Sequence, residues 1–206
     1  ENNIILIFDE CTSGFRETFG GLHKKFKIQP DMAIFGKALG NGYAITATIG
    51  RRDVMEAAQN TFISSTFWTE RIGPVAALKT LEIMERERSW EQMTSIGQII
   101  RRRWQELADH YGLSINHHGL LALCGFTFQS CKSLEYKTLI TQEMLKRGFL
   151  ASTSCYVSIA HTPDVLEHYF SALEDVFAVI AICEDGCNVG QFLDGPVCHE
   201  SFRRLN

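Results

Sequence analysis

The sequence predicts an α/β fold, and three patterns support this prediction. A continuous run of branched apolar residues at positions 4–8 is typical of a buried parallel strand. From position 73 the apolar residues recur at helical spacing instead. Further along, short strand-like stretches alternate with helical ones, and the chain contains no internal repeat.

Two apolar runs near the N-terminus predict neighbouring strands. The first, at 4–8, stops at Asp9 and Glu10, and the second, at 32–35, stops at Gly36 and Lys37. A third strand is expected over 43–49. We expect the first strand to be covered on both faces, as strands of parallel sheets are. Functional groups in such sheets gather at the carboxyl ends of the strands, which makes Asp9 and Lys37 candidate site residues.

Three helices and two further strands are predicted after the first sheet. The helices cover 73–87, the region of 96–107 with an end near Gly112, and the residues after Thr162. The last of them has the clearest start, because Thr162, Pro163 and Asp164 supply a cap, a first-turn proline and a first-turn acid. Strand-like stretches lie at 120–128 and 156–160. The change of pattern predicts two domains, 1–88 and 89–206, the second of α+β type with an extended tail from residue 184.

Composition excludes several classes of protein. Of the 206 residues, 45% are hydrophobic and 21% charged, with a net charge of −4, so we expect a globular protein that does not bind nucleic acid through bulk charge. No apolar run reaches the roughly 18 residues of a membrane span. Seven irregularly spaced cysteines predict reduced thiols, no metal site and a cytoplasmic location. The chain begins with Glu1 and enters an apolar run at once, which we interpret as a piece of a longer protein.

A set of short motifs carries more information than either charged residue alone, since acids and lysines that end strands are common. In order, they are Leu6-Ile7-Phe8-Asp9-Glu10, Gly14-Phe15-Arg16, Pro30-Asp31, Gly36-Lys37-Ala38-Leu39-Gly40-Asn41-Gly42 and Ser65-Thr66-Phe67. Together they resemble the class III aminotransferases, a pyridoxal-phosphate-dependent family that includes glutamate-1-semialdehyde aminomutase and the ornithine and 4-aminobutyrate aminotransferases.

The resemblance implies a fold-type I enzyme present as a partial chain. Residues 1–88 would be the last part of the large, mostly parallel-sheet domain that binds the cofactor. Residues 89–206 would be the small C-terminal α+β domain. The family's upstream half, with its phosphate-binding turn and the aromatic residue that stacks on the ring, has no counterpart in these 206 residues.

The same resemblance implies a role for each candidate residue. Asp9 would pair with the pyridine nitrogen of pyridoxal phosphate, and Lys37 would form the internal Schiff base and shuttle the proton. Cys11 stands where the family has a residue packed on the cofactor ring. Thr66 would bind the cofactor phosphate of a neighbouring subunit, which implies a homodimer. Thr69, five residues before Pro74, is a second candidate for that phosphate, and Thr66 as a plain helix cap is the alternative.

The implied reaction is transfer or migration of an amino group, with small molecules as amino donor and acceptor. Two alternatives stay open: a catalytically silent fragment that serves dimerisation or regulation, and another pyridoxal-phosphate activity such as decarboxylation or epimerisation. A nucleoside triphosphate site is rejected. Asp31 occupies the first glycine's place in the GxxxxGK[ST] pattern, and Ala38 follows the lysine.

Overall fold

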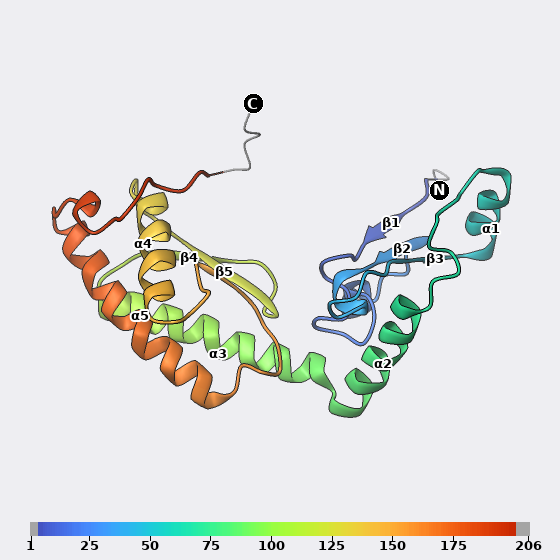
Figure 1. The fold of residues 1–206 in the computed structure, drawn as a ribbon, viewed down its shortest axis with the longest axis horizontal. Coiled ribbons are helices and arrows are strands. Elements are labelled where there is room, and N and C mark those ends of the chain that lie inside the picture. Colours follow the sequence, from blue (N-terminus) through green and yellow to red (C-terminus); the bar gives the residue numbers. More distant parts are fainter. Residues whose placement is uncertain (1–3, 201–206) are drawn as a thin grey trace. The chain divides into compact units, whose positions relative to one another are not determined.

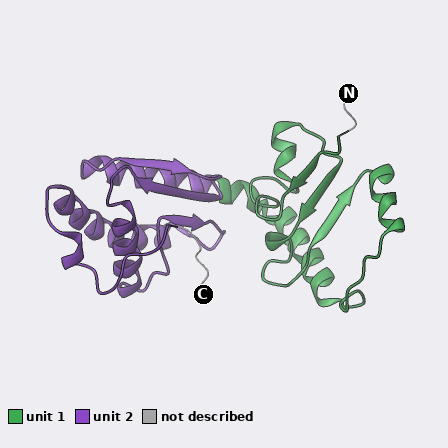
Figure 2. Ribbon diagram, turned by 90° about the horizontal axis from the view of Figure 1, so that it is seen from above, with its two compact units in different colours: residues 1–94 green, residues 95–206 purple. Residues whose placement is uncertain are grey.

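The computed structural model describes residues 4–200 of the chain (Figure 1). The chain divides into two compact units, residues 1–94 and 95–206, which Figure 2 colours separately. This division lies within helix α3 (Ser89–His110). The boundary predicted at residue 88 falls at the junction of helices α2 (Ile72–Glu87) and α3, where Arg88 ends α2 in the left-handed conformation.

A three-stranded mixed sheet forms the centre of the first unit. Strand β1 (Ile7–Asp9) is parallel to β2 (Met32–Phe35), which is antiparallel to β3 (Ala47–Gly50). Asp9 lies opposite Ile34, so the carboxyl ends of β1 and β2 meet at one edge. The helical segments are η1 (Leu22–Phe26), η2 (Lys37–Leu39), α1 (Arg52–Met55), η3 (Glu56–Asn60) and α2 (Ile72–Glu87).

The core of the first unit is small. Its core cluster consists of the buried residues Ala33, Phe35, Leu39 and Ala77. The prediction that residues 4–8 form a strand covered on both faces is wrong, because residues 4–7 are 44–79% exposed and the strand begins only at Ile7. β1 is an edge strand that pairs, among the described residues, with β2 alone. The third strand is also shorter than predicted and begins at Ala47.

The second unit packs helices on an antiparallel sheet of order β4-β5-β6. Its elements are α3 (Ser89–His110), β4 (Ile115–His118), β5 (Leu123–Phe128), α4 (Ser133–Lys146), β6 (Ser154–Tyr156), α5 (Pro163–Glu184) and η4 (Val189–Gln191). The ring of Phe126 on β5 packs against Trp104 of α3 at 4.9 Å and Phe177 of α5 at 6.1 Å between ring centres. All three side chains are fully buried.

Helix α5 confirms its predicted start. The hydroxyl of Thr162 accepts a hydrogen bond from the backbone N–H of Val165 at 3.4 Å, and Pro163 is the first helical residue. Its apolar positions are buried along one face, as their spacing predicts. Strand β4 and helix α4 were not predicted. No helix within residues 4–200 is both long and apolar enough to cross a lipid bilayer.

Candidate active site

Asp9 and Lys37 lie at the same edge of the first sheet, because β1 and β2 are parallel neighbours. Asp9 is the last residue of β1, and Lys37 follows β2 after a single glycine. The strand termini therefore place a carboxylate and an amine at the same edge of the sheet, as the sequence predicts. Neither side chain forms an ion pair with any residue between 4 and 200, and both are exposed.

Lys37 has a constrained backbone and a directed side chain. Its φ of 44° lies in the left-handed region, which is unfavourable for a side chain of this size. The turn that holds it is closed by hydrogen bonds from Leu39 N–H to Gly36 O (3.0 Å) and from Asn41 N–H to Lys37 O (3.1 Å). The amine Nζ donates a hydrogen bond to the hydroxyl of Thr12. The loop after β1 therefore fixes the direction of the amine.

The Cys11 thiol interacts with both the Asp9 carboxylate and the Lys37 amine, which shift its pKa in opposite directions. Its backbone N–H donates to Asp9 Oδ1 at 3.0 Å. Burial and the neighbouring Asp9 carboxylate raise the pKa of the Cys11 thiol, while the Lys37 amine acts in the opposite direction. Cys11 is thus a neutral, half-buried thiol, and such a side chain behaves as a small apolar group.

Glu10 anchors the loop that carries these residues. Its carboxylate is 3% exposed and accepts hydrogen bonds from the Ser13 hydroxyl and from the backbone N–H of His23 at 2.9 Å, with His23 Nδ1 at 3.1 Å. Burial opposes ionisation, but the hydrogen bonds outweigh it and hold the pKa of Glu10 below its ordinary value. The loop also packs closely at Gly14, where a Cβ would lie 2.7 Å from Glu10 O and from the Phe35 ring.

Two residues that contact the candidate site or its anchor were missed by the sequence reasoning. Thr12, the partner of the Lys37 amine, lies between two quoted motifs, and its role depends on a loop conformation that no periodicity reveals. His23 lies thirteen residues from the carboxylate it contacts. The one available signal was position: both residues belong to the segment that joins two strands with chemistry at their ends.

Thr66 does not contact the other candidate residues. It lies in an exposed turn, and the first helical N–H groups after it, of Ile72 and Gly73, donate to the carboxylate of Glu70 at 2.5 and 3.2 Å. These bonds, that of Ile72 foremost, lower the pKa of Glu70. The N-cap residue of α2 is Arg71, and the Glu70 carboxylate accepts from the first helical N–H groups, so the alternative that Thr66 is a plain helix cap is wrong. Thr69 is exposed in the same turn.

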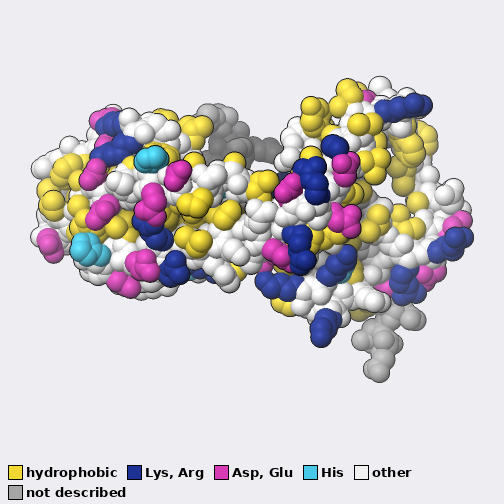
Figure 3. Space-filling view, turned by 90° about the horizontal axis from the view of Figure 1, so that it is seen from below, with side chains coloured by type: hydrophobic (Ala, Val, Ile, Leu, Met, Phe, Trp, Pro, Cys, Tyr) yellow, Lys and Arg dark blue, Asp and Glu magenta, His cyan; other side chains and the backbone are white. Residues whose placement is uncertain are grey.

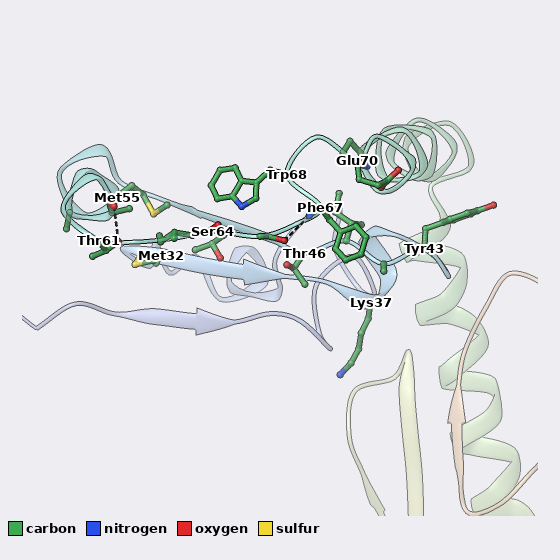
Figure 4. Close-up of a pocket in the computed structure, with 18 of the residues that line it drawn as sticks. Met32, Lys37, Tyr43, Thr46, Met55, Thr61, Ser64, Phe67, Trp68 and Glu70 are labelled. Atoms are coloured by element: carbon green, nitrogen blue, oxygen red, sulfur yellow. Dashed lines mark hydrogen bonds between the residues drawn. The ribbon is translucent and has the colours of Figure 1, made fainter.

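A large open cavity of about 1350 Å³ lies beside this segment. It is lined by Lys37, by the segments 42–48 and 54–58 and by residues of the 61–70 loop, including Ser64, Phe67 and Trp68. Asp9, Cys11 and Thr66 are absent from its described lining. In Figure 4 the Lys37 side chain points away from Trp68 and Ser64. Residues 4–200 contain no group of three or more His, Cys, Asp or Glu side chains placed to hold a metal ion.

Comparison with known proteins identifies the family. Residues 1–164 match the class-III aminotransferase family, to which this chain belongs. The chain is 33% identical over 182 residues to 3-aminobutyryl-CoA aminotransferase of Cloacimonas acidaminovorans, covering 85% of this chain and 44% of that protein. It is 29% identical over 194 residues to glutamate-1-semialdehyde 2,1-aminomutase of Methanocaldococcus jannaschii, covering 86% and 45%. The chain thus spans less than half the length of these relatives.

The fold agrees with this assignment. The PLP internal aldimine form of the FumI protein of Sphingopyxis sp. MTA144 matches with a TM-score of 0.79 and 22% identity, over 88% of this chain and 44% of that one. The predicted fold-type I class is confirmed, and pyridoxal phosphate is the cofactor of the family. The residues present fit this cofactor, because the Lys37 amine and the Asp9 carboxylate form no ion pair with any described residue and the Cys11 thiol beside them is neutral.

Proposed function

We propose that this chain is the lysine-bearing part of a pyridoxal-phosphate-dependent aminotransferase or aminomutase that moves an amino group between or within small molecules. The observation that carries the proposal is the placement of Asp9 and Lys37 at the carboxyl ends of two adjacent parallel strands. The aminotransferase and aminomutase relatives support the same class of reaction.

Asp9 and Cys11 would hold the cofactor ring. When bound, pyridoxal phosphate supplies an electron-withdrawing ring that stabilises negative charge on a substrate carbon. A carboxylate about 4 Å from a protonated ring nitrogen is attracted by about 4 kcal/mol at an effective dielectric constant of about 20, so Asp9 would keep that nitrogen protonated. Cys11 would offer the ring a neutral side chain that leaves this charge balance unchanged.

Lys37 would bind the cofactor through Nζ and carry the proton that the reaction moves. Thr12 orients this amine, because its hydroxyl oxygen accepts the hydrogen bond from Nζ. The left-handed backbone of Lys37 and the buried anchor at Glu10 hold the two partners in place. Thr12 is therefore a positioning residue in this proposal.

A second copy of the chain would complete the site. The 61–69 segment is exposed throughout and carries large apolar side chains, among them Phe62, Phe67 and Trp68. Figure 3 shows hydrophobic side chains interrupting the charged surface on one face of the molecule. Burial of this segment against a partner copy would bring Thr66 or Thr69 to the partner's cofactor phosphate. The seven free thiols support a reducing compartment, and we propose the cytoplasm.

One observation favours a second candidate function, a catalytically silent subunit. The apolar residues 4–7 are largely exposed, so the edge strand of the sheet that carries Asp9 and Lys37 leaves apolar side chains uncovered within the described chain. A chain in this state would keep the residues of the family without a complete cofactor site.

Covalent labelling separates the two candidates. The purified chain is mixed with pyridoxal phosphate, reduced with borohydride and mapped by peptide mass spectrometry. We expect pyridoxyl-lysine at position 37, which is lost in Lys37→Ala. Lys27→Ala is the matched control, because Lys27 is also exposed and also left-handed, with φ 55°. Scattered or absent labelling would contradict the proposal and favour the silent subunit.

A further inference from the structure

A second cavity, of about 350 Å³, lies within the unit of residues 95–206. Most of its wall is apolar and comes from α3, α5 and the segment that leads into β6, with Ile100, Leu166 and Phe149 among its residues. Two reactive side chains, Cys155 and His161, also line it. The cavity therefore gives small molecules access to a thiol.

Behind Cys155 lies a second thiol. Cys124 of β5 and Cys155 of β6 are directly opposite partners in antiparallel strands, so their side chains project from the same face of the sheet. Cys124 is fully buried, and its sulfur lies 4.0 Å from the backbone oxygen of Cys155. Opposite residues in such a pair have Cα atoms roughly 4.5–5.5 Å apart, within the range of about 4.4–6.8 Å found in disulfides.

The two thiols also interact with each other and with His161. A hydrogen bond between the thiols lowers the pKa of Cys124, whereas the same contact and burial raise the pKa of Cys155. His161 Nε2 lies 4.0 Å from the Cys155 sulfur. Its Nδ1 lies 3.0 Å from the N–H of Ser158, and in the tautomer that accepts this bond the ring proton is on Nε2 and faces the sulfur.

We propose that Cys124 and Cys155 form a thiol–disulfide site that is oxidised by small hydroperoxides entering the cavity lined by Cys155 and His161. With hydrogen peroxide, the Cys155 thiol loses its proton as its sulfur attacks one peroxide oxygen; an S–O bond forms, the O–O bond breaks, and the departing hydroxide takes up that proton and leaves as water. Cys124 then attacks the Cys155 sulfur, an S–S bond forms, and the S–O oxygen leaves with the Cys124 proton as a second water. Two thiols are oxidised and one hydrogen peroxide is reduced.

A disulfide between Cys124 and Cys155 would link the edge strand β6 covalently to β5. Among the described residues β6 pairs with β5 alone, through a short ladder of three residue pairs. A covalent link between the central residues of that ladder would hold β6 and the His161 segment after it in place. Oxidation would thus change the stability of the second unit without involving Lys37.

The test is oxidation of the purified chain with hydrogen peroxide, followed by thiol counting and peptide mapping. Of seven cysteines, two are consumed, so we expect 7 − 2 = 5 thiols that react with N-ethylmaleimide after denaturation. We also expect a peptide pair that joins residues 124 and 155 and separates with dithiothreitol. Cys124→Ala and Cys155→Ala should lose the crosslink, while Cys131→Ala, which removes an exposed thiol, should keep it.

His161→Gln provides a second measurement on a chain that retains both thiols. We expect the same crosslink to form severalfold more slowly, because the sulfur loses the imidazole N–H that faces it. The proposal is overturned if the mapped peptides show oxidised Cys155 without a bond to Cys124, crosslinks only between chains, or seven thiols still free.

Discussion

The two units of the chain differ in how completely they bury their own hydrophobic side chains. The largest fully buried residues, among them Trp104, Phe126 and Phe177, all lie in 95–206. In the first unit the described core cluster consists of Phe35 with three smaller residues, Ala33, Leu39 and Ala77, while Phe62, Phe67 and Trp68 are exposed. The unit that carries Asp9 and Lys37 is therefore the one that depends more on contacts beyond those described.

Because of this difference, the core packing that stabilises the second unit and the loop that presents the candidate site residues are stabilised by different interactions. Residues 95–206 gain their stability from internal packing, whereas the loop that presents Cys11 and Thr12 is held by one buried carboxylate and its hydrogen bonds. A site built in this way is sensitive to single polar substitutions, while a close-packed core is sensitive to the loss of volume.

Removal of the Phe126 ring should have the largest effect on stability. Phe126 contacts Trp104 and Phe177, so Phe126→Ala leaves a cavity and should lower the free energy of unfolding of residues 95–206 by about 3–5 kcal/mol. The matched control is Phe62→Ala in the first unit, since Phe62 is 95% exposed and should change stability by less than about 0.5 kcal/mol. Urea denaturation followed by circular dichroism measures both. If both substitutions lower the free energy of unfolding equally, the conclusion that the two units differ in how they bury hydrophobic side chains would be contradicted.

Substitution of Glu10 tests the polar anchor of the first unit. Glu10→Gln keeps the shape but loses the charge that Ser13 and His23 stabilise, and should cost about 1–3 kcal/mol at neutral pH. Because the folded-state pKa is lowered, this contribution is present above the ordinary value of 4.5 and is lost as the pH falls through the folded-state pKa.

The measurement for Glu10 is the difference in unfolding free energy between wild type and variant at neutral pH and at about pH 3. Glu56→Gln, at an exposed glutamate of the same unit, is the control and should show no such difference. If the difference in unfolding free energy between wild type and Glu10→Gln is the same at both pH values, the charge of Glu10 does not anchor the loop. Pyridoxyl labelling at Lys37 should fall in Glu10→Gln and stay unchanged in the control.

Glu143 in the second unit should contribute less to the free energy of unfolding than Glu10 does, and this contribution should also be lost in acid. Hydrogen bonds from Lys146, Gln142 and Arg147 outweigh burial and lower the pKa of Glu143 to about 2. Its stabilisation is therefore present above the ordinary value of 4.5 and is lost between about pH 4.5 and 2. Because these ion pairs lie at the surface, Glu143→Gln should cost about 1 kcal/mol or less. Thermal unfolding of both proteins from pH 6 to 2 should converge at the acid end, and parallel curves would contradict the assignment.

The sequence predicted those parts of the fold that depend on local signals. The start of α5 follows from Thr162 and Pro163 alone, and the common edge of Asp9 and Lys37 follows from where two apolar runs end. Helix α4 also carried a usable signal, since its buried residues Tyr136, Ile140 and Met144 recur every fourth position. Strand β4 carried none, because Ile115-Asn116-His117-His118 does not alternate between apolar and polar residues.

What the sequence could not predict depends on distant contacts. The exposure of residues 4–7 follows from what packs on β1, which no property of the run itself reveals. The contact of Thr12 with Lys37 depends on a loop shaped by Glu10 and His23. Thr66 matched a family motif, but Glu70 holds the helix start that it precedes, so the phosphate role assigned to Thr66 or Thr69 remains a prediction.

Trp68 should show the smallest effect on folding and a clear effect on association. Its side chain is 64% exposed, so Trp68→Ala removes little buried area and should change the free energy of unfolding by less than about 0.5 kcal/mol. The same exposure makes it a contact residue for a second copy, and aromatic side chains often supply much of the binding energy of an interface. Sedimentation velocity should therefore show weaker self-association of Trp68→Ala than of wild type. Tyr156→Ala is the control, because Tyr156 is exposed to 62% in the other unit. If the two changes weaken association equally, or neither does, the exposed surface of the first unit is not where the copies meet.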